Sequence, residues 1–268
     1  MSEIAAIGVF DSGVGGLSIL KEIRQLLPGE DLTYLADSAY CPYGTKPVSE
    51  IRARILKVAA FLSGLGVKAI VVACNTASIA GLDQVREAYP LIPVIGVEPA
   101  LKPAHGLTRN GKIGVLATSL TLKGDRFSVL VEQFGADVEV YTKPAPGLVE
   151  LVEAGKLDTP ETETLLHQYL DPLLEKQIDT LVLGCTHYPF LIPMIRNICG
   201  PKVTILDTGL AVAKQTVRVL EQNRILNPRP RVGEETFYTS GDPEVVNEVV
   251  AKLWSKKSVK VLKAQIEA

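Results

Sequence analysis

The chain has 268 residues, of which 47% are hydrophobic and 22% are charged, and its formal net charge is −2. These are ordinary values for a folded globular protein, and the near-neutral charge gives no indication of nucleic acid or a membrane surface as a partner. No apolar run approaches the roughly 20 residues of a membrane-spanning helix, and the first residues lack the pattern of a signal peptide. Four scattered cysteines are too few for a disulfide framework, so we expect free thiols in a reducing cytoplasm.

Short apolar runs alternate with amphipathic stretches, which predicts parallel β-sheet covered by helices. The first predicted strands lie at 4–10, 32–37, 68–73 and 92–97. The segments between them predict helices over 15–29, 49–66 and 76–89, and a loop rich in turn residues over 38–47. We therefore expect an α/β fold.

A second series of elements then begins, with strands predicted at 112–118, 137–142, 179–184 and 203–207. After residue 220 the sequence predicts a strand over 235–240, a helix over 243–256 and a strand over 258–263. We expect this last segment to complete the first half, because the chain must return from the second.

Three segments of the first half resemble three segments of the second half, in the same order and at nearly the same spacing. They are "IGVFDS" with "IGVLAT", "AIVVACNT" with "TLVLGCTH" and, more loosely, "IPVIGVEPA" with "VTILDTGLA". This ordered set predicts two similar domains, each a mainly parallel sheet flanked by helices, related by a pseudo-two-fold axis. The first domain would comprise residues 1–97 and 208–268, and the second residues 98–207. We expect the active site in the cleft between them.

Four short motifs follow predicted strands, at the sheet edge where open α/β sheets bind ligands. They are Asp11-Ser12, Pro42-Tyr43-Gly44, Cys74-Asn75-Thr76 and Cys185-Thr186-His187. Each motif cysteine lies between a strand and a predicted helix, whose dipole would favour the thiolate. The adjacent Asn and Thr side chains and free backbone N–H groups suit a carboxylate.

Two opposed thiols could carry a proton from one face of a carbon atom to the other. One thiolate would take the proton and the opposite thiol would return one, which needs only a modest shift from the unperturbed pKa of about 8.5. Asp11 and His187 are candidates to assist as local proton donors or acceptors. Glu153 is a candidate to orient His187. For either cysteine alone, the competing interpretation is a small side chain of the core.

The segments "FDSGVGG", "CPYG", "ACNTAS" and "GCTHYP" together closely resemble the cofactor-independent glutamate racemases of the aspartate/glutamate racemase superfamily. The resemblance covers essentially the whole chain. It implies an isomerase that interconverts L- and D-glutamate without pyridoxal phosphate or metal and supplies D-glutamate for peptidoglycan. It also implies a homodimer.

By this resemblance, Cys74 and Cys185 are the two catalytic acid/base residues, with Cys74 acting as the base towards D-glutamate and Cys185 towards L-glutamate. The positions that match those holding the charged groups of the substrate are Asp11, Ser12, Tyr43, Gly44, Asn75, Thr76, Thr186 and His187. Family members that need a nucleotide-sugar activator usually carry an N-terminal extension, and only three residues precede the first predicted strand. We therefore do not expect that form of regulation.

Other functions remain open on the residues alone. One is a racemase for another acidic amino acid, chiefly aspartate, and another is a non-catalytic protein that closes on a small acidic ligand without using the thiols. A structural zinc site is disfavoured because the chain has no C-x₂-C pair. The "GVGG" segment has neither a complete G-x-G-x-x-G nor a Walker lysine, so a phosphate loop is not predicted. Cys41 adjoins the "CPYG" loop without an evident acid/base partner, Cys199 is interpreted as a helix end, and His105 and His167 are interpreted as structural.

Overall fold

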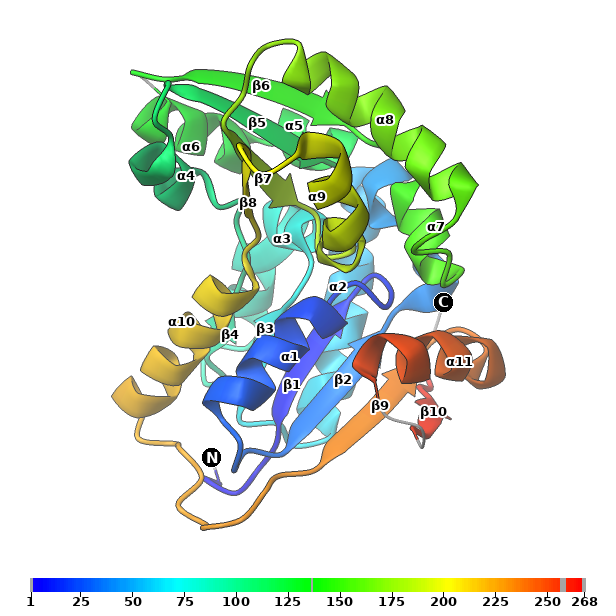
Figure 1. Cartoon of the computed structure of the whole chain (residues 1–268). Coiled ribbons are helices and arrows are strands. Elements are labelled where there is room, and N and C mark those ends of the chain that lie inside the picture. Colours follow the sequence, from blue (N-terminus) through cyan, green and yellow to red (C-terminus); the bar gives the residue numbers. More distant parts are fainter. Residues whose placement is uncertain (1, 136, 256–258, 267–268) are drawn as a thin grey trace.

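The computed structural model describes residues 2–135, 137–255 and 259–266, which form two separate sheets (Figure 1). The larger sheet has the order β10-β9-β2-β1-β3-β4. Its strands are β1 (Ile7–Asp11), β2 (Leu32–Ala36), β3 (Ala69–Val72), β4 (Val94–Ile95), β9 (Glu235–Thr239) and β10 (Val261–Lys263). Every neighbouring pair in it is parallel.

The smaller sheet has the order β6-β5-β7-β8 and is also parallel throughout. Its strands are β5 (Lys112–Ala117), β6 (Glu139–Pro144), β7 (Thr180–Gly184) and β8 (Thr204–Leu206). The order β2-β1-β3-β4 of the first sheet recurs here as β6-β5-β7-β8. The sequence repeat is therefore a repeat of topology, and the predicted α/β class with two parallel sheets is confirmed.

The last part of the chain returns to the first sheet, as predicted. β9 pairs with β2, and β10 pairs with β9. Between them lies α11 (Pro243–Trp254). The predicted helix over 243–256 and strand over 258–263 each extend into residues 256–258, which lie outside the described residues.

The two faces of the larger sheet bury different side chains. Ile7 and Val9 of β1 belong to the core shared with α1 (Leu17–Leu26), α10 (Gly209–Gln222) and α11, whereas Phe10 belongs to the core shared with α2 (Val48–Gly64) and α3 (Asn75–Ala88). Figure 1 shows α1, α10 and α11 on one side of this sheet. Successive side chains of a strand point to opposite faces of the sheet, and both faces are covered. Nearly every residue of a buried strand is therefore apolar, which explains the continuous apolar runs in the sequence.

Helices also cover both faces of the smaller sheet. One set comprises α4 (Leu101–Leu107), α5 (Ser119–Lys123) and α6 (Asp125–Phe134), and the other α7 (Leu148–Glu153), α8 (Pro160–Leu174) and α9 (Ile192–Cys199). The chain enters this sheet after β4 and leaves it after β8, where α10 begins. In the described part of the chain, no helix combines the length and the apolar character needed to cross a bilayer.

Two predicted segments differ from the structure. The strand predicted over 92–97 is only two residues long in the structure, as β4. Pro93, just before it, has no N–H group to donate a hydrogen bond to a neighbouring strand. The loop over 38–47 contains two 3₁₀ helices, η1 (Ser38–Tyr40) and η2 (Tyr43–Thr45), separated by a cis peptide bond between Cys41 and Pro42.

Candidate active site

The predicted site residues gather where strands of both sheets end. Asp11 is the last residue of β1, Cys74 lies two residues beyond β3, and Cys185 follows β7 directly. The two sheets meet at this point, because the Thr186 hydroxyl donates a hydrogen bond to Asp11 Oδ2 over 3.3 Å. The carboxyl ends of the central strands thus form one site, as expected for open parallel sheets.

Cys74 is the N-cap residue of α3. Its Sγ accepts a hydrogen bond from the Ala77 N–H over 3.4 Å, and its thiol lies 3.9 Å from the Ser12 hydroxyl. Burial raises the pKa of the Cys74 thiol well above its usual value, and the negative charge of Asp11 adds to this, while the Ala77 N–H opposes it. Cys74 is therefore a thiol at neutral pH until a positive charge comes close to it.

Cys185 has a different stabilising group. A helix follows Cys185, as predicted, but it does not begin at the cysteine: the 3₁₀ helix η3 (Tyr188–Leu191), with a proline in its first turn, comes before α9. Instead, Cys185 Sγ lies 3.8 Å from His187 Nδ1. The two cysteines are thus supported by unlike groups, a helix N-terminus and an imidazole.

Glu153 holds the other side of the His187 ring. His187 Nε2 lies 2.6 Å from Glu153 Oε1, and the same oxygen accepts the Val14 N–H over 2.6 Å. Burial alone lowers the pKa of His187, but its contacts with Cys185, Cys41 and Glu153 together raise this pKa well above 6.5. His187 therefore carries a positive charge beside Cys185.

Asp11 is fully buried and lies between these groups. Its Oδ2 accepts the Gly16 N–H over 2.8 Å and lies 3.9 Å from His187 Nδ1. Burial raises the pKa of Asp11, and the charge of His187 opposes this shift. Asp11 is thus a buried carboxyl group in contact with the Cys74 side of the site and with His187.

The glycines of "GVGG" allow this close approach. A Cβ added at Gly13 would lie 1.9 Å from Glu153 Oε1, and one added at Gly15 would lie 2.2 Å from His187 Nδ1. Side chains at these positions would displace the Glu153–His187 pair. The segment serves packing of the site, a role that was not predicted from the sequence.

Asn75 is 2% exposed, and neither its Nδ2 nor its Oδ1 has a hydrogen-bond partner in the described part of the chain. A buried polar group without a partner costs about 1–3 kcal/mol, so an amide that stays in this state indicates a ligand site. Thr76 Oγ1 lies 3.0 Å from Thr118 Oγ1 and 3.4 Å from Thr121 Oγ1. Neither partner threonine was predicted from the sequence, although the repeat aligns Thr118 with Ser12.

The "CPYG" loop contributes in two ways. The Tyr43 hydroxyl donates to Asp37 Oδ2 over 2.5 Å, and Asp37 also pairs with Arg54, whose Nη2 lies 2.7 Å from Oδ1. Tyr43 therefore orders the loop with its hydroxyl turned to Asp37, a buried pair that the sequence analysis missed. Gly44 faces the other sheet, since a Cβ there would lie 2.9 Å from Thr118 Cβ.

Cys41 does have an acid/base partner, contrary to the sequence interpretation. Its Sγ, a carboxylate oxygen of Glu153 and a ring nitrogen of His187 all lie within 4.8 Å of one another. The other residues interpreted as structural lie apart from the site. Cys199 ends α9, and His105 and His167 make exposed ion pairs with Asp137 and Asp171.

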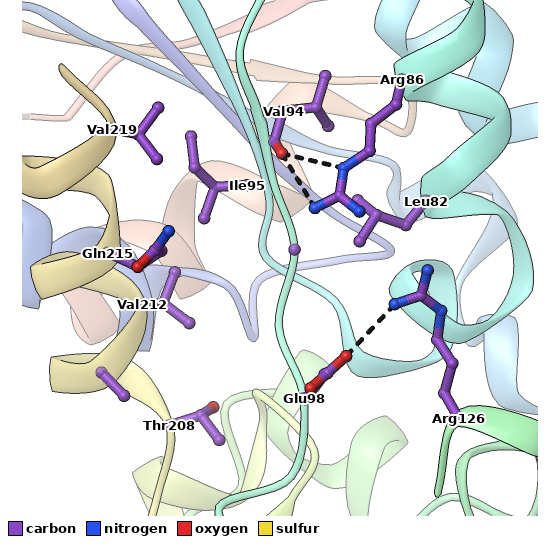
Figure 2. Close-up of a pocket in the computed structure, with 12 residues that line it drawn as sticks. Leu82, Arg86, Val94, Ile95, Glu98, Arg126, Thr208, Val212, Gln215 and Val219 are labelled. Carbon is purple, nitrogen blue, oxygen red and sulfur yellow. Dashed lines mark hydrogen bonds and ion pairs between the residues drawn. The ribbon is translucent and has the colours of Figure 1, made fainter. Parts of the chain in front are cut away.

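The site is closed, since both cysteines are less than a tenth exposed. A small cavity of about 40 Å³ lies beside it, between the "CPYG" loop and Thr118. A larger cavity of about 460 Å³ lies elsewhere, between α3, β4 and α10, and neither site cysteine lines it (Figure 2). There Arg126 pairs with Glu98 over 3.3 Å. The two thiols therefore need some opening of the structure before a small molecule can reach them.

Comparison with known proteins identifies the family of this chain. The Asp/Glu/Hydantoin racemase family matches residues 7–216. The glutamate racemase of Pseudomonas aeruginosa is 49% identical over 252 residues, 94% of this chain and 95% of its own length. The crystal structure of glutamate racemase isoform RacE1 from Bacillus anthracis has a TM-score of 0.87 at 35% identity, covering 97% of each chain. That of the Francisella tularensis enzyme in complex with D-glutamate has a TM-score of 0.86 at 33% identity, covering 99% of each. This chain belongs to the Asp/Glu/Hydantoin racemase family.

Proposed function

We propose that this protein is a glutamate racemase that interconverts L- and D-glutamate by proton transfer between two cysteines. The observation that carries the proposal is that Cys74 and Cys185 follow strands of the two sheets where the Thr186–Asp11 hydrogen bond joins them, each beside its own stabilising group. The similarity to the Pseudomonas and Francisella glutamate racemases supports glutamate as the substrate.

The neighbouring polar groups suit the charges of glutamate. The unpartnered Asn75 amide can donate to the α-carboxylate, and Asp11 can hold the α-ammonium. The Ser12 and Thr186 hydroxyls donate to Asp11 in this structure, and they would turn to the α-carboxylate when the ammonium takes their place. The backbone at Gly44 and the Thr118 hydroxyl lie farther along the cleft, where the side-chain carboxylate would bind.

The chemistry then consists of two balanced proton transfers. From D-glutamate, the Cys74 thiolate takes the Cα proton, the electron pair of the broken bond spreads into the α-carboxylate, and the Cys185 thiol gives its proton to the opposite face. The reverse reaction begins with the Cys185 thiolate. The ammonium group of the bound substrate favours the Cys74 thiolate, and the charged His187 lies 3.8 Å from Cys185 Sγ.

Circular dichroism of each glutamate enantiomer, incubated separately with reduced protein in D₂O, tests the proposal. We expect both signals to decay to zero while deuterium enters Cα. Decay for aspartate but not glutamate would select the other acidic substrate. If the protein is a racemase, Cys74→Ser and Cys185→Ser should each abolish turnover. If it only binds glutamate, the wild type should show no decay of the circular dichroism signal, and both variants should still bind glutamate.

Further proposals concern the whole molecule. The chain changes sheets after β4 and after β8, which supports domains of residues 1–97 with 208–268, and of 98–207. The four free cysteines support a reducing cytoplasm, where D-glutamate would enter peptidoglycan synthesis and so support cell shape. We also propose a homodimer, which light scattering coupled to size-exclusion chromatography would detect as twice the mass of the chain.

A further inference from the structure

Cys41, Glu153 and His187 form a cluster of three metal-binding side chains beside the proposed site. Their donor atoms all lie within 4.8 Å of one another. Sulfur, imidazole nitrogen and carboxylate oxygen are the donors that Zn²⁺ prefers, at distances of about 2.0–2.3 Å from the ion. Since donor atoms around one tetrahedral ion lie roughly 3.5 Å apart, small side-chain rotations would bring these three together.

The cluster has a route to solvent that avoids both catalytic thiols. The Glu153 side chain is 20% exposed. It lines a cavity of about 370 Å³, together with Ser38 of η1 and Asp242 at the start of α11. The Ser38 hydroxyl is buried and has no hydrogen-bond partner among the described residues. A hydrated cation could therefore reach Glu153 from this side and find polar groups on the way.

The geometry points to an inhibitory site for a thiophilic divalent cation such as Zn²⁺ at Cys41, Glu153 and His187. On binding, the thiol proton of Cys41 and the proton between His187 and Glu153 leave to solvent, and three protein–metal bonds form. The metal replaces the hydrogen bond between His187 and Glu153. His187 then ceases to carry the positive charge that supports Cys185, so proton transfer stops.

This site differs from a structural zinc site built on all the cysteines. Within the described residues, this cluster is the only group of three or more candidate ligands, and it contains neither Cys74, Cys185 nor Cys199. Its fourth coordination position would be open to water. The expected binding is therefore reversible, and the fold does not depend on it.

Three proteins test the inference: the wild type, Cys41→Ser and Cys199→Ser. Cys199 is the matched control because it is also a half-buried free cysteine but lies outside the cluster. We expect micromolar free Zn²⁺ to inhibit racemisation by the wild type and Cys199→Ser at least tenfold, and a chelator to restore it. Cys41→Ser should lose most of the inhibition, expressed as the ratio of its own rates with and without Zn²⁺, whatever its rate without metal.

Co²⁺ binding gives a second measurement that does not depend on turnover. The wild type and Cys199→Ser should show the near-ultraviolet thiolate-to-cobalt absorption band, and Cys41→Ser should lack it. The inhibitory role rests on the proposed racemase function, but the band would remain if that function failed. Equal zinc inhibition of the wild type and Cys41→Ser, a cobalt band that persists without Cys41, or no metal binding at all would overturn the inference.

Discussion

Replacing Glu153 by Gln removes the negative charge that lies beside His187, while the size and shape of the side chain at position 153 stay the same. The bond between Glu153 Oε1 and His187 Nε2 is 2.6 Å long, and the His187 side chain is only 2% exposed. A hydrogen bond to a charged group contributes about 1.5–3 kcal/mol, and each 1.36 kcal/mol of transition-state stabilisation is a factor of ten in rate. We therefore expect kcat/KM to fall roughly 10- to 100-fold.

The pH profile distinguishes this effect from general damage. Contact with Glu153 is one of the causes that raise the pKa of His187. Without the carboxylate, that pKa falls, so the charged His187 is lost at a lower pH. The basic limb of the profile of kcat/KM should accordingly move towards lower pH in Glu153→Gln.

Circular dichroism of both enantiomers, measured across a pH series, provides the assay. Because L- and D-glutamate have equal free energies in water, kcat/KM must fall equally in the two directions. Glu163→Gln is the control, since Glu163 is an exposed residue on α8. A loss smaller than threefold, or an unchanged basic limb with a large loss, would refute the positioning role of Glu153.

Three further changes have defined outcomes. Asn75→Ala should raise KM for glutamate about tenfold without lowering the thermal midpoint, because it removes a buried amide that lacks a partner; an unchanged KM would exclude a binding role. Asp37→Ala should lower the free energy of unfolding in urea by about 3–5 kcal/mol, because it breaks the buried ion pair between Asp37 and Arg54; a loss below 1 kcal/mol would contradict this. Gly15→Ala should lower kcat more than tenfold with an unchanged far-ultraviolet spectrum, because its Cβ would meet His187; wild-type kcat would show that the ring can move aside.

The sequence predicted the sheets well because buried parallel strands leave continuous apolar runs. Local sequence also made Cys74 and Cys185 candidates, because the two form a matched pair, each at the end of an apolar run and followed by small polar residues. β4 was predicted too long because an apolar run does not reveal how many of its residues find a neighbouring strand.

The missed contacts join segments that are distant in sequence. Asp37 with Arg54, and Thr76 with Thr118, meet only after helices and sheets have packed together. The contacts of Cys41 with Glu153 and His187 were missed for the same reason. Hydrophobic periodicity predicts single helices and strands, and it does not predict which of them pack together. Glu153 was found as a candidate because its helix was expected to follow β6 closely.

The return of the chain to its first sheet has a consequence for biosynthesis. All strands of the smaller sheet come from one continuous segment, residues 112–206. The larger sheet is incomplete until β9 and β10, near the C-terminal end of the chain, have been synthesised. While the protein emerges from the ribosome, β2 has an unpaired edge until residue 235 and beyond has been translated. The smaller sheet can therefore form during translation, and the larger one is completed only near chain release. A truncation before β9 would leave an edge strand open to aggregation.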